Sequence, residues 1–205
     1  MLSHARSMIE RLEIVAAHYS GKQDLPVLPV NFAEIRSDPV VGVRIAAAYL
    51  KAPMVSPDAL PAYRALREET LRQLDHLIKH ARLELDVAPD DPYHDVEALR
   101  AELREGKLRI WSTASGGNPH PYLSDDDNDA FRAVHDAFGH GATGCGFDRH
   151  GEEGAWRKHS QMYSPLARQA MTTETRGQTC MFVYGNDNQY FSEQKAIILP
   201  AEFWA

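Results

Sequence analysis

The sequence predicts a mostly α-helical fold with a minor β component (α+β), in a single domain that spans residues 1–205. Three observations support this prediction. Apolar residues recur at helical spacing over much of the chain, between residues that cap and break helices. Only one early segment, Leu108–Thr113, alternates as a half-buried strand does. The composition, with 43% apolar and 25% charged residues, is ordinary for a globular domain.

The first half, residues 1–106, is expected to be a helical scaffold. The predicted helices are Ser3–Tyr19 (ended by Gly21), Pro39–Lys51, a long helix from Ser56 to about Leu85, and Asp95–Glu105, with a loop at Leu25–Asn31 and a turn at Ala88–Tyr93. On the long helix, His76 and His80 lie four residues apart and so share a face. Because Asp75, Lys79 and Arg82 surround them, we interpret the pair as part of a charged face.

The second half, residues 107–205, is expected to carry the chemistry. After the strand and a loop at Ala114–Pro121, the predicted elements are a helix from a Ser124 cap to Gly139, a helix over Gly151–Met162, and a helix from Ser164–Pro165 to Gly177. Two apolar runs, Met181–Tyr184 and Ala196–Leu199, predict a small two-stranded sheet near the C-terminus.

Charge and cysteine content exclude several classes of function. A net charge of −7 argues against general nucleic-acid binding and against a membrane-surface protein. No apolar run approaches the ~20 residues that a membrane span requires. The two cysteines, Cys145 and Cys180, form no CxxC pair, which argues against a disulfide scaffold and favours a reducing, cytoplasmic location.

A metal site is the main functional prediction. His135 and His140 lie five residues apart and bracket Gly139, and Glu174 follows on the last strong helix. Two imidazoles and one carboxylate form the facial triad that holds non-heme Fe(II) with open coordination positions. On an ideal helix two residues five apart point roughly 140° from each other. The histidines can therefore converge only if the helix ends or distorts between them, and Gly139 permits both.

Three other interpretations of these residues were weighed. A di-iron bundle requires paired Glu-x-x-His motifs, and Glu152 and Glu153 lack the histidines, so these acids are interpreted as a helix start. A His-Asp metal-dependent phosphohydrolase that acts on nucleotides would bind metal through His135 and Asp136, with His76 or His80 as an upstream ligand. A non-enzymatic structural or interaction protein would bind no metal and would pair Glu174 with an arginine, Arg176 or Arg168.

The order of the motifs resembles a known family. His135–His140 reads H-D-A-F-G-H, where the family has His-Glu-x-x-Gly-His, and Thr172-Thr173-Glu174 is similar to the family's later Thr-x-Glu. Leu108 to Pro200 thus resembles the catalytic domain of the pterin-dependent aromatic amino acid hydroxylases. The resemblance implies a mononuclear Fe(II) monooxygenase, a hydroxylase that uses dioxygen and a pterin, with His135, His140 and Glu174 as ligands.

The departures from the family concern the substrate and the pterin. The family's glutamate on the pterin side is Asp136 here, which we assign to catalysis as an orienting or cofactor-facing carboxylate. The family's substrate-binding arginine has no match in Ala114–Ser124. A free aromatic amino acid and a pterin are therefore left unassigned, and the expected partners are dioxygen and a small-molecule substrate. The candidate pocket residues are His120, Tyr122, Trp156 and Arg176.

Overall fold

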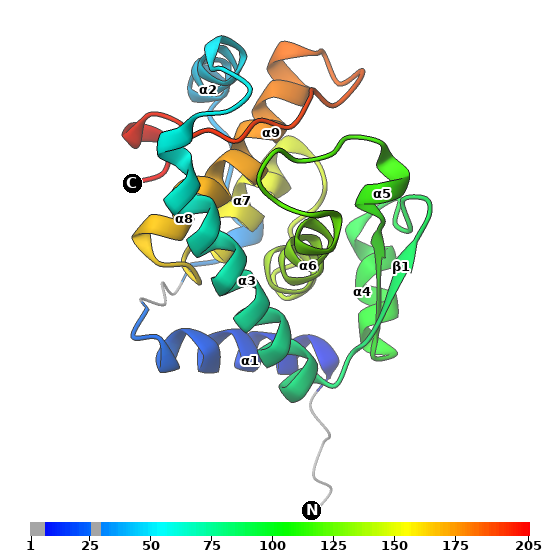
Figure 1. The fold of residues 1–205 in the computed structure, drawn as a ribbon. Helices are drawn as coiled ribbons and strands as arrows, with labels where there is room; N and C mark the ends of the chain where they lie inside the picture. The colour runs from blue at the N-terminus through cyan, green and yellow to red at the C-terminus, as the bar shows by residue number, and fades with distance from the viewer. Residues whose placement is uncertain (1–6, 26–29) are drawn as a thin grey trace, which may run out of the picture.

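The computed structural model describes residues 7–25 and 30–205, which are mostly helical and contain one two-stranded parallel sheet. The expected fold class, mostly α with minor β, is confirmed at this level. The α-helices are α1 (Met8–Lys22), α2 (Pro39–Lys51), α3 (Leu60–Ala81), α4 (Val96–Arg104), α5 (Thr113–Gly116), α6 (Asp125–His135), α7 (Arg149–Ser160), α8 (Pro165–Thr172) and α9 (Gln178–Cys180), and the strands are β1 (Glu84–Ala88) and β2 (Lys107–Trp111) (Figure 1). The parts of the predicted first helix and first loop at residues 1–6 and 26–29 lie outside the described residues.

Side-chain caps explain where several helices begin. The Ser124 hydroxyl accepts from the Asp127 amide and the Asp127 carboxylate accepts from the Ser124 amide, so the predicted cap of α6 is confirmed as a capping box. The Ser164 hydroxyl caps α8 as predicted. Ser7 caps α1 with a second capping box, and α2 has its predicted bounds.

The long helix of the first half ends earlier than the sequence predicts. Arg82 adopts the left-handed conformation (φ 60°), which ends α3 after Ala81 without a glycine. The chain then enters β1, which pairs in parallel with β2, Leu85 opposite Leu108. The predictions of helix to about Leu85 and of a turn from Ala88 are therefore wrong in part, whereas the predicted strand at Leu108 is confirmed as β2.

Two glycines that were predicted to end helices do not end them. Beyond α6 the chain continues as the π-helical turn η3 (Asp136–Gly141), and beyond α8 it continues as η4 (Thr173–Gly177), α9 and η5 (Met181–Gly185). The predicted C-terminal sheet is consequently wrong, because its first strand lies in η5. Its second run contributes only an isolated bridge, in which Ala196 pairs with Val55.

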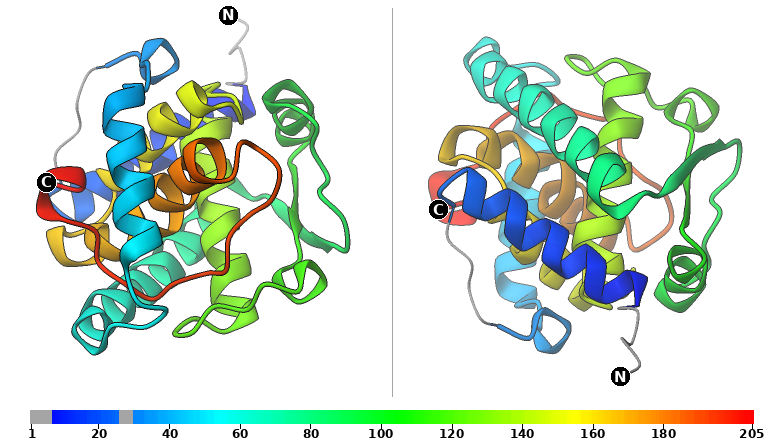
Figure 2. Two further views of the ribbon diagram at one scale, coloured as in Figure 1. Left: turned by 90° about the horizontal axis from the view of Figure 1, so that it is seen from above. Right: turned by 90° about the horizontal axis from the view of Figure 1, so that it is seen from below.

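The two halves of the chain share one core. Figure 1 shows α6 near the middle of the molecule, with α3 and α8 on one side and α4 and β1 on the other. The views in Figure 2 show α2 beside the turns that follow α9, and residue contacts join the same elements. The largest apolar cluster draws on both halves, from Leu12 and Leu77 to Leu108 and Phe138. Within the described residues, no helix combines the length and the apolar character needed to cross a membrane.

Candidate metal centre

A π-helical turn brings His135 and His140 together. The amide of Ala142 donates to the carbonyl of Ala137 over 2.9 Å, a bond between residues five apart in place of the usual four. The two imidazole rings, also five apart, therefore meet edge to face with their centroids 4.9 Å apart. The helix distorts between the histidines, which is one of the two geometries that the spacing requires.

Gly139 has a role here other than ending the helix. A Cβ atom at this position would lie 3.1 Å from Nδ1 of His135, 3.2 Å from its Cε1 and 3.3 Å from the Cβ of Ala155. These contacts are tighter than ordinary packing allows, so a larger residue would displace the His135 ring. The absence of a side chain at Gly139 thus lets the imidazole lie against the helix backbone.

The carboxylate that joins the two histidines is that of Glu152. One ligand atom from each of His135, His140 and Glu152 lies within 4.8 Å of the other two, and His140 Nε2 is 3.7 Å from Glu152 Oε1. Glu152 lies in the first turn of α7, which Asp148 caps. Its predicted place at a helix start is confirmed, but no pattern in the sequence assigns it to the metal site.

The tautomer of His140 follows from one hydrogen bond. Its Nδ1 lies 2.9 Å from the carbonyl oxygen of Cys145, which can only accept, so Nδ1 carries the proton. The Nε2 atom is then unprotonated, and this is the atom nearest to Glu152. A backbone carbonyl that holds the outer nitrogen in this way is typical of metal-binding histidines.

A relay of three hydrogen bonds fixes His135. The Gln73 amide nitrogen donates to the carbonyl of Met162 (3.2 Å), so its oxygen faces Nε2 of His159 (2.9 Å) and must accept from it. His159 therefore presents an unprotonated Nδ1, to which Nδ1 of His135 donates over 3.0 Å. The remaining atom, His135 Nε2, is unprotonated, buried, and without a hydrogen-bond partner.

Burial controls the charges of the three groups. It lowers the pKa of His135 well below its usual value, with further lowering from His140 and His159, and it also lowers the pKa of His140. Burial, together with the nearby carboxylate of Asp148, raises the pKa of Glu152 to about 8, although a hydrogen bond with Thr179 acts to lower it. Two neutral imidazoles thus face a carboxyl group that, among the described residues, pairs with no arginine or lysine.

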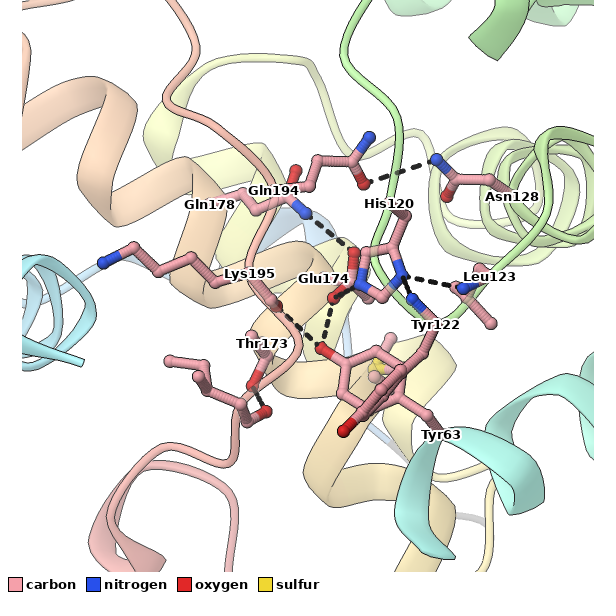
Figure 3. Close-up of polar contacts among 12 residues, drawn as sticks. Tyr63, His120, Tyr122, Leu123, Asn128, Thr173, Glu174, Gln178, Gln194 and Lys195 are labelled. Atoms are coloured by element: carbon pink, nitrogen blue, oxygen red, sulfur yellow. Dashed lines mark hydrogen bonds and ion pairs between the residues drawn. The ribbon is translucent and has the colours of Figure 1, made fainter. Parts of the chain in front are cut away.

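Glu174, the predicted third ligand, is not part of this group. Its Oε1 accepts from the Tyr63 hydroxyl (2.5 Å) and lies 3.2 Å from His120 Nε2, and its Oε2 accepts from the Gln178 amide (2.7 Å) (Figure 3). Nδ1 of His120 accepts from the backbone amides of Tyr122 and Leu123, at 3.0 and 2.9 Å. His120 Nε2 therefore carries the proton and donates to Glu174.

Neutral donors alone satisfy Glu174. Its side chain is 1% exposed, and neither Arg176 nor Arg168 pairs with it, in contrast to the prediction for a protein without a metal. Arg176 pairs with Glu153 through two bonds of 2.8 and 2.9 Å, and Arg168 donates to the carbonyl of Ser160. The carboxylate is thus fully hydrogen-bonded without a metal or a cation.

Both carboxylates open onto one large cavity of about 890 Å³. His135, Asp136 and His140 line it as well, so the predicted catalytic acid Asp136 faces the same space. Burial raises the pKa of Asp136 to about 6, while the nearby His140 and Arg132 act to lower it. The other walls carry aromatic and amide side chains, among them Trp111, Phe131, Phe191, Asn128, Gln178 and Gln194.

The four predicted pocket residues lie elsewhere. None of His120, Tyr122, Trp156 and Arg176 lines the cavity. The Tyr122 hydroxyl donates to the carbonyl of Ser56, and the Trp156 indole donates to Thr172 and lies under the Arg176 guanidinium, 4.2 Å from the ring centre. These side chains support the walls, because their polar atoms already have partners within the protein.

The donor set fits a divalent transition metal. Two imidazoles and one carboxylate suit Fe(II), and the buried, partnerless Nε2 of His135 is a polar atom that a metal would satisfy. Glu152, Gln73 and His159 were not identified from the sequence, because each comes from a helix with an ordinary amphipathic pattern. No protein-family model, no curated protein and no solved structure matches the chain.

Proposed function

We propose that the chain is a mononuclear non-heme Fe(II) oxygenase of the hydroxylase class, with His135 and His140 as metal ligands. The observation that carries this proposal is the pair of unprotonated Nε2 atoms, each held in place by a hydrogen bond at its own Nδ1. Such pre-set tautomers are what a metal site requires of its histidines. A structural histidine pair has no need of an orphaned buried nitrogen.

We assign the third ligand to Glu152 in place of Glu174. Glu152 is close to both histidines and, within the part of the chain that the structure describes, pairs with no arginine or lysine, whereas Glu174 is satisfied by Tyr63 and two further donors. A metal at Glu152 would stabilise a carboxylate that burial now disfavours. Glu174 instead forms a fixed wall of the cavity, where its position orients Gln178 toward the same space.

The chain's own residues would bind and shelter the reactants. When bound, Fe(II) held by two histidines and one carboxylate supplies open positions at which dioxygen is activated. The cavity of about 890 Å³ is large enough for a small organic molecule beside these positions. Its amide side chains, including Asn128 and Gln178, would orient polar groups of the substrate, and Phe131 and Trp111 would exclude water.

A nucleotide phosphohydrolase is the weaker candidate. Such an enzyme would bind metal through Asp136, but within the described residues Asp136 is not among the grouped ligand atoms. Its expected upstream ligands, His76 and His80, belong to a different group of side chains. Among the residues that line the cavity, the acidic side chains outnumber the arginines, which disfavours a phosphate substrate.

Iron content tests the proposal most directly. The purified chain is stripped of metal, loaded with Fe(II) without oxygen and desalted, and the iron is then measured per chain. We expect one iron in the wild type and background levels in His135→Ala and His140→Ala. The matched control is His94→Gln, which alters an exposed histidine at the rim of the same cavity and should retain one iron.

Two further measurements separate the candidate functions. Nitric oxide, a probe of open coordination positions on Fe(II), should give an EPR signal in the wild type and in His94→Gln only. Circular dichroism should show that His135→Ala and His140→Ala stay folded. Unchanged iron content in folded His135→Ala would overturn the proposed site, and phosphate release from nucleotides without oxygen would favour the phosphohydrolase.

A further inference from the structure

A second group of histidines lies between α1 and α3, away from the cavity. His18 of α1 joins His76 and His80 of α3, and one ligand atom of each lies within 4.8 Å of the other two. The ring centroids are 4.3 Å apart for His76 and His80, 5.1 Å for His18 and His76, and 5.3 Å for His18 and His80. None of the three lines the large cavity. Figure 1 shows α3 passing in front of α1, and residue contacts join the two helices.

The sequence neighbours of His76 indicated a charged face, but the structure corrects this interpretation. Its side chain is buried against α1, where its ring packs on Tyr19 with the centroids 5.5 Å apart. Its Nε2 atom is buried and has no hydrogen-bond partner. A hydrogen bond with the backbone of Val15 raises the pKa of His76, as a carbonyl acceptor would, but burial outweighs it and lowers that pKa to about 4. The ring is therefore neutral, and its buried Nε2 atom is available to a ligand or an ion.

We propose that His18, His76 and His80 form a separate zinc-class metal site that joins α1 to α3. Imidazole nitrogens favour Zn²⁺, Cu²⁺ or Ni²⁺ over Mg²⁺ and Ca²⁺, which prefer oxygen ligands. Zinc–nitrogen bonds of about 2.0–2.1 Å in a tetrahedron place the nitrogens roughly 3.3 Å apart. The ligand atoms of the three histidines lie within 4.8 Å of one another, so these separations need to shorten by about 1.5 Å at most. Exposed His18 is free to make that movement, and water would complete the tetrahedron.

The charges around the three histidines affect how tightly they would bind a metal ion. Lys22 lowers the pKa of both His76 and His80, so its ammonium also opposes a bound cation, and Lys79 acts on His80 in the same direction. Asp75 has the opposite effect on His80. We therefore expect moderate affinity, and we expect Lys22→Gln to bind zinc on the order of twofold to fivefold more tightly than the unaltered chain.

A titration in a background without the proposed iron site tests this inference independently. The full-length His135→Ala/His140→Ala chain is stripped of metal and titrated with Zn²⁺, with Co²⁺ as a spectroscopic probe. One equivalent should bind, with the visible absorption of tetrahedral cobalt. Adding His18→Ala, a surface change that leaves the core intact, should weaken binding by about 100-fold or more, since one of three ligands is lost. His76→Ala in the same background should behave likewise.

Heat stability gives a second readout. Zinc bound only by the folded chain should raise the melting temperature of this background, and His18→Ala should abolish that rise. His94→Gln in the same background is the control and should retain both binding and the rise. Absence of zinc binding in the background, or unchanged binding after His18→Ala, would overturn the second site. Neither outcome bears on the iron proposal, because both of its histidines are absent from the protein tested.

Discussion

Glu152 and Glu174 face the same cavity but differ in how their charge is stabilised. Glu174 is 1% exposed and accepts hydrogen bonds from Tyr63, His120 and Gln178. Glu152 faces the Nε2 atom of His140 at 3.7 Å, and burial raises its pKa to about 8. Three donors within the protein satisfy the oxygens of the Glu174 carboxylate, whereas burial disfavours the charged form of Glu152 beside its neutral imidazoles. A position beside the cavity therefore does not identify a metal ligand, whereas a buried carboxylate without a compensating positive charge does.

The first prediction tests this comparison and has the largest expected effect. Glu152→Gln removes the charge of a proposed ligand and should weaken Fe(II) binding by more than about 100-fold. This loss exceeds the roughly 10–100-fold loss of metal affinity that is typical when a residue hydrogen-bonded to a ligand is changed. Glu174→Gln should change the affinity by less than about tenfold, because its partners are protein groups. Competition titrations with a calibrated chelator under nitrogen would measure both. If Glu174→Gln loses iron and Glu152→Gln keeps it, the ligand assignment from the family resemblance is right and ours is wrong.

The metal site also shows how much of its geometry can be predicted from the sequence. The spacing of His135 and His140 and the need for a distorted helix were visible, because helix geometry fixes where side chains point. The π-helical form was not predicted, because no residue pattern indicates a change in hydrogen-bond spacing from four residues to five. Glu152 was assigned to a helix start, which is correct. Because a place in the first turn of a helix explains an acidic residue fully, the sequence does not indicate the proposed role of Glu152 as a metal ligand.

The fold shows the same limits. Capping residues identified most helix starts, but the glycines Gly139 and Gly177 did not mark helix ends. Arg82 ends α3 in a left-handed conformation that a sequence predicts only for glycine or asparagine. Gly177 does not end its helix, and a Cβ atom at this position would lie 3.1 Å from Leu199 and 3.3 Å from Tyr49. The contacts of Tyr63 and Gln73 with the site span more than eighty residues of chain, which local patterns cannot report.

The second prediction concerns the Glu174 side of the cavity. Tyr63→Phe removes a donor to a buried carboxylate and should lower the free energy of unfolding by about 1.5–3 kcal/mol, the range for hydrogen bonds to charged groups. Tyr184→Phe is the matched control, because the Tyr184 hydroxyl is buried without a partner. Its removal should be neutral or slightly stabilising. Urea unfolding of the metal-free chains would measure both, and equal losses would show that Glu174 does not depend on Tyr63.

The third prediction concerns the Glu152 side and has the smallest expected effect. Gln73→Leu removes the acceptor that fixes the tautomer of His159, and with it the tautomer of His135. Because Gln73 acts through two other side chains, we expect a loss of about tenfold in Fe(II) affinity, the low end of the range for outer partners. Gln73→Glu keeps an acceptor at the same place and should largely restore binding.

The Gln73 variants also separate a positioning role from a structural one. Gln73→Leu places an apolar side chain of similar size in a buried site, so the fold should persist while the His159 ring becomes free to donate to His135. NMR of ring protons in ¹⁵N-histidine-labelled, metal-free protein would report the tautomers directly. We expect Nδ1 protonation of His135 in the wild type and in Gln73→Glu, and a mixture of tautomers in Gln73→Leu. A single unchanged tautomer together with lost iron would mean that Gln73 acts by packing, and that the orientation of His135 does not depend on the relay.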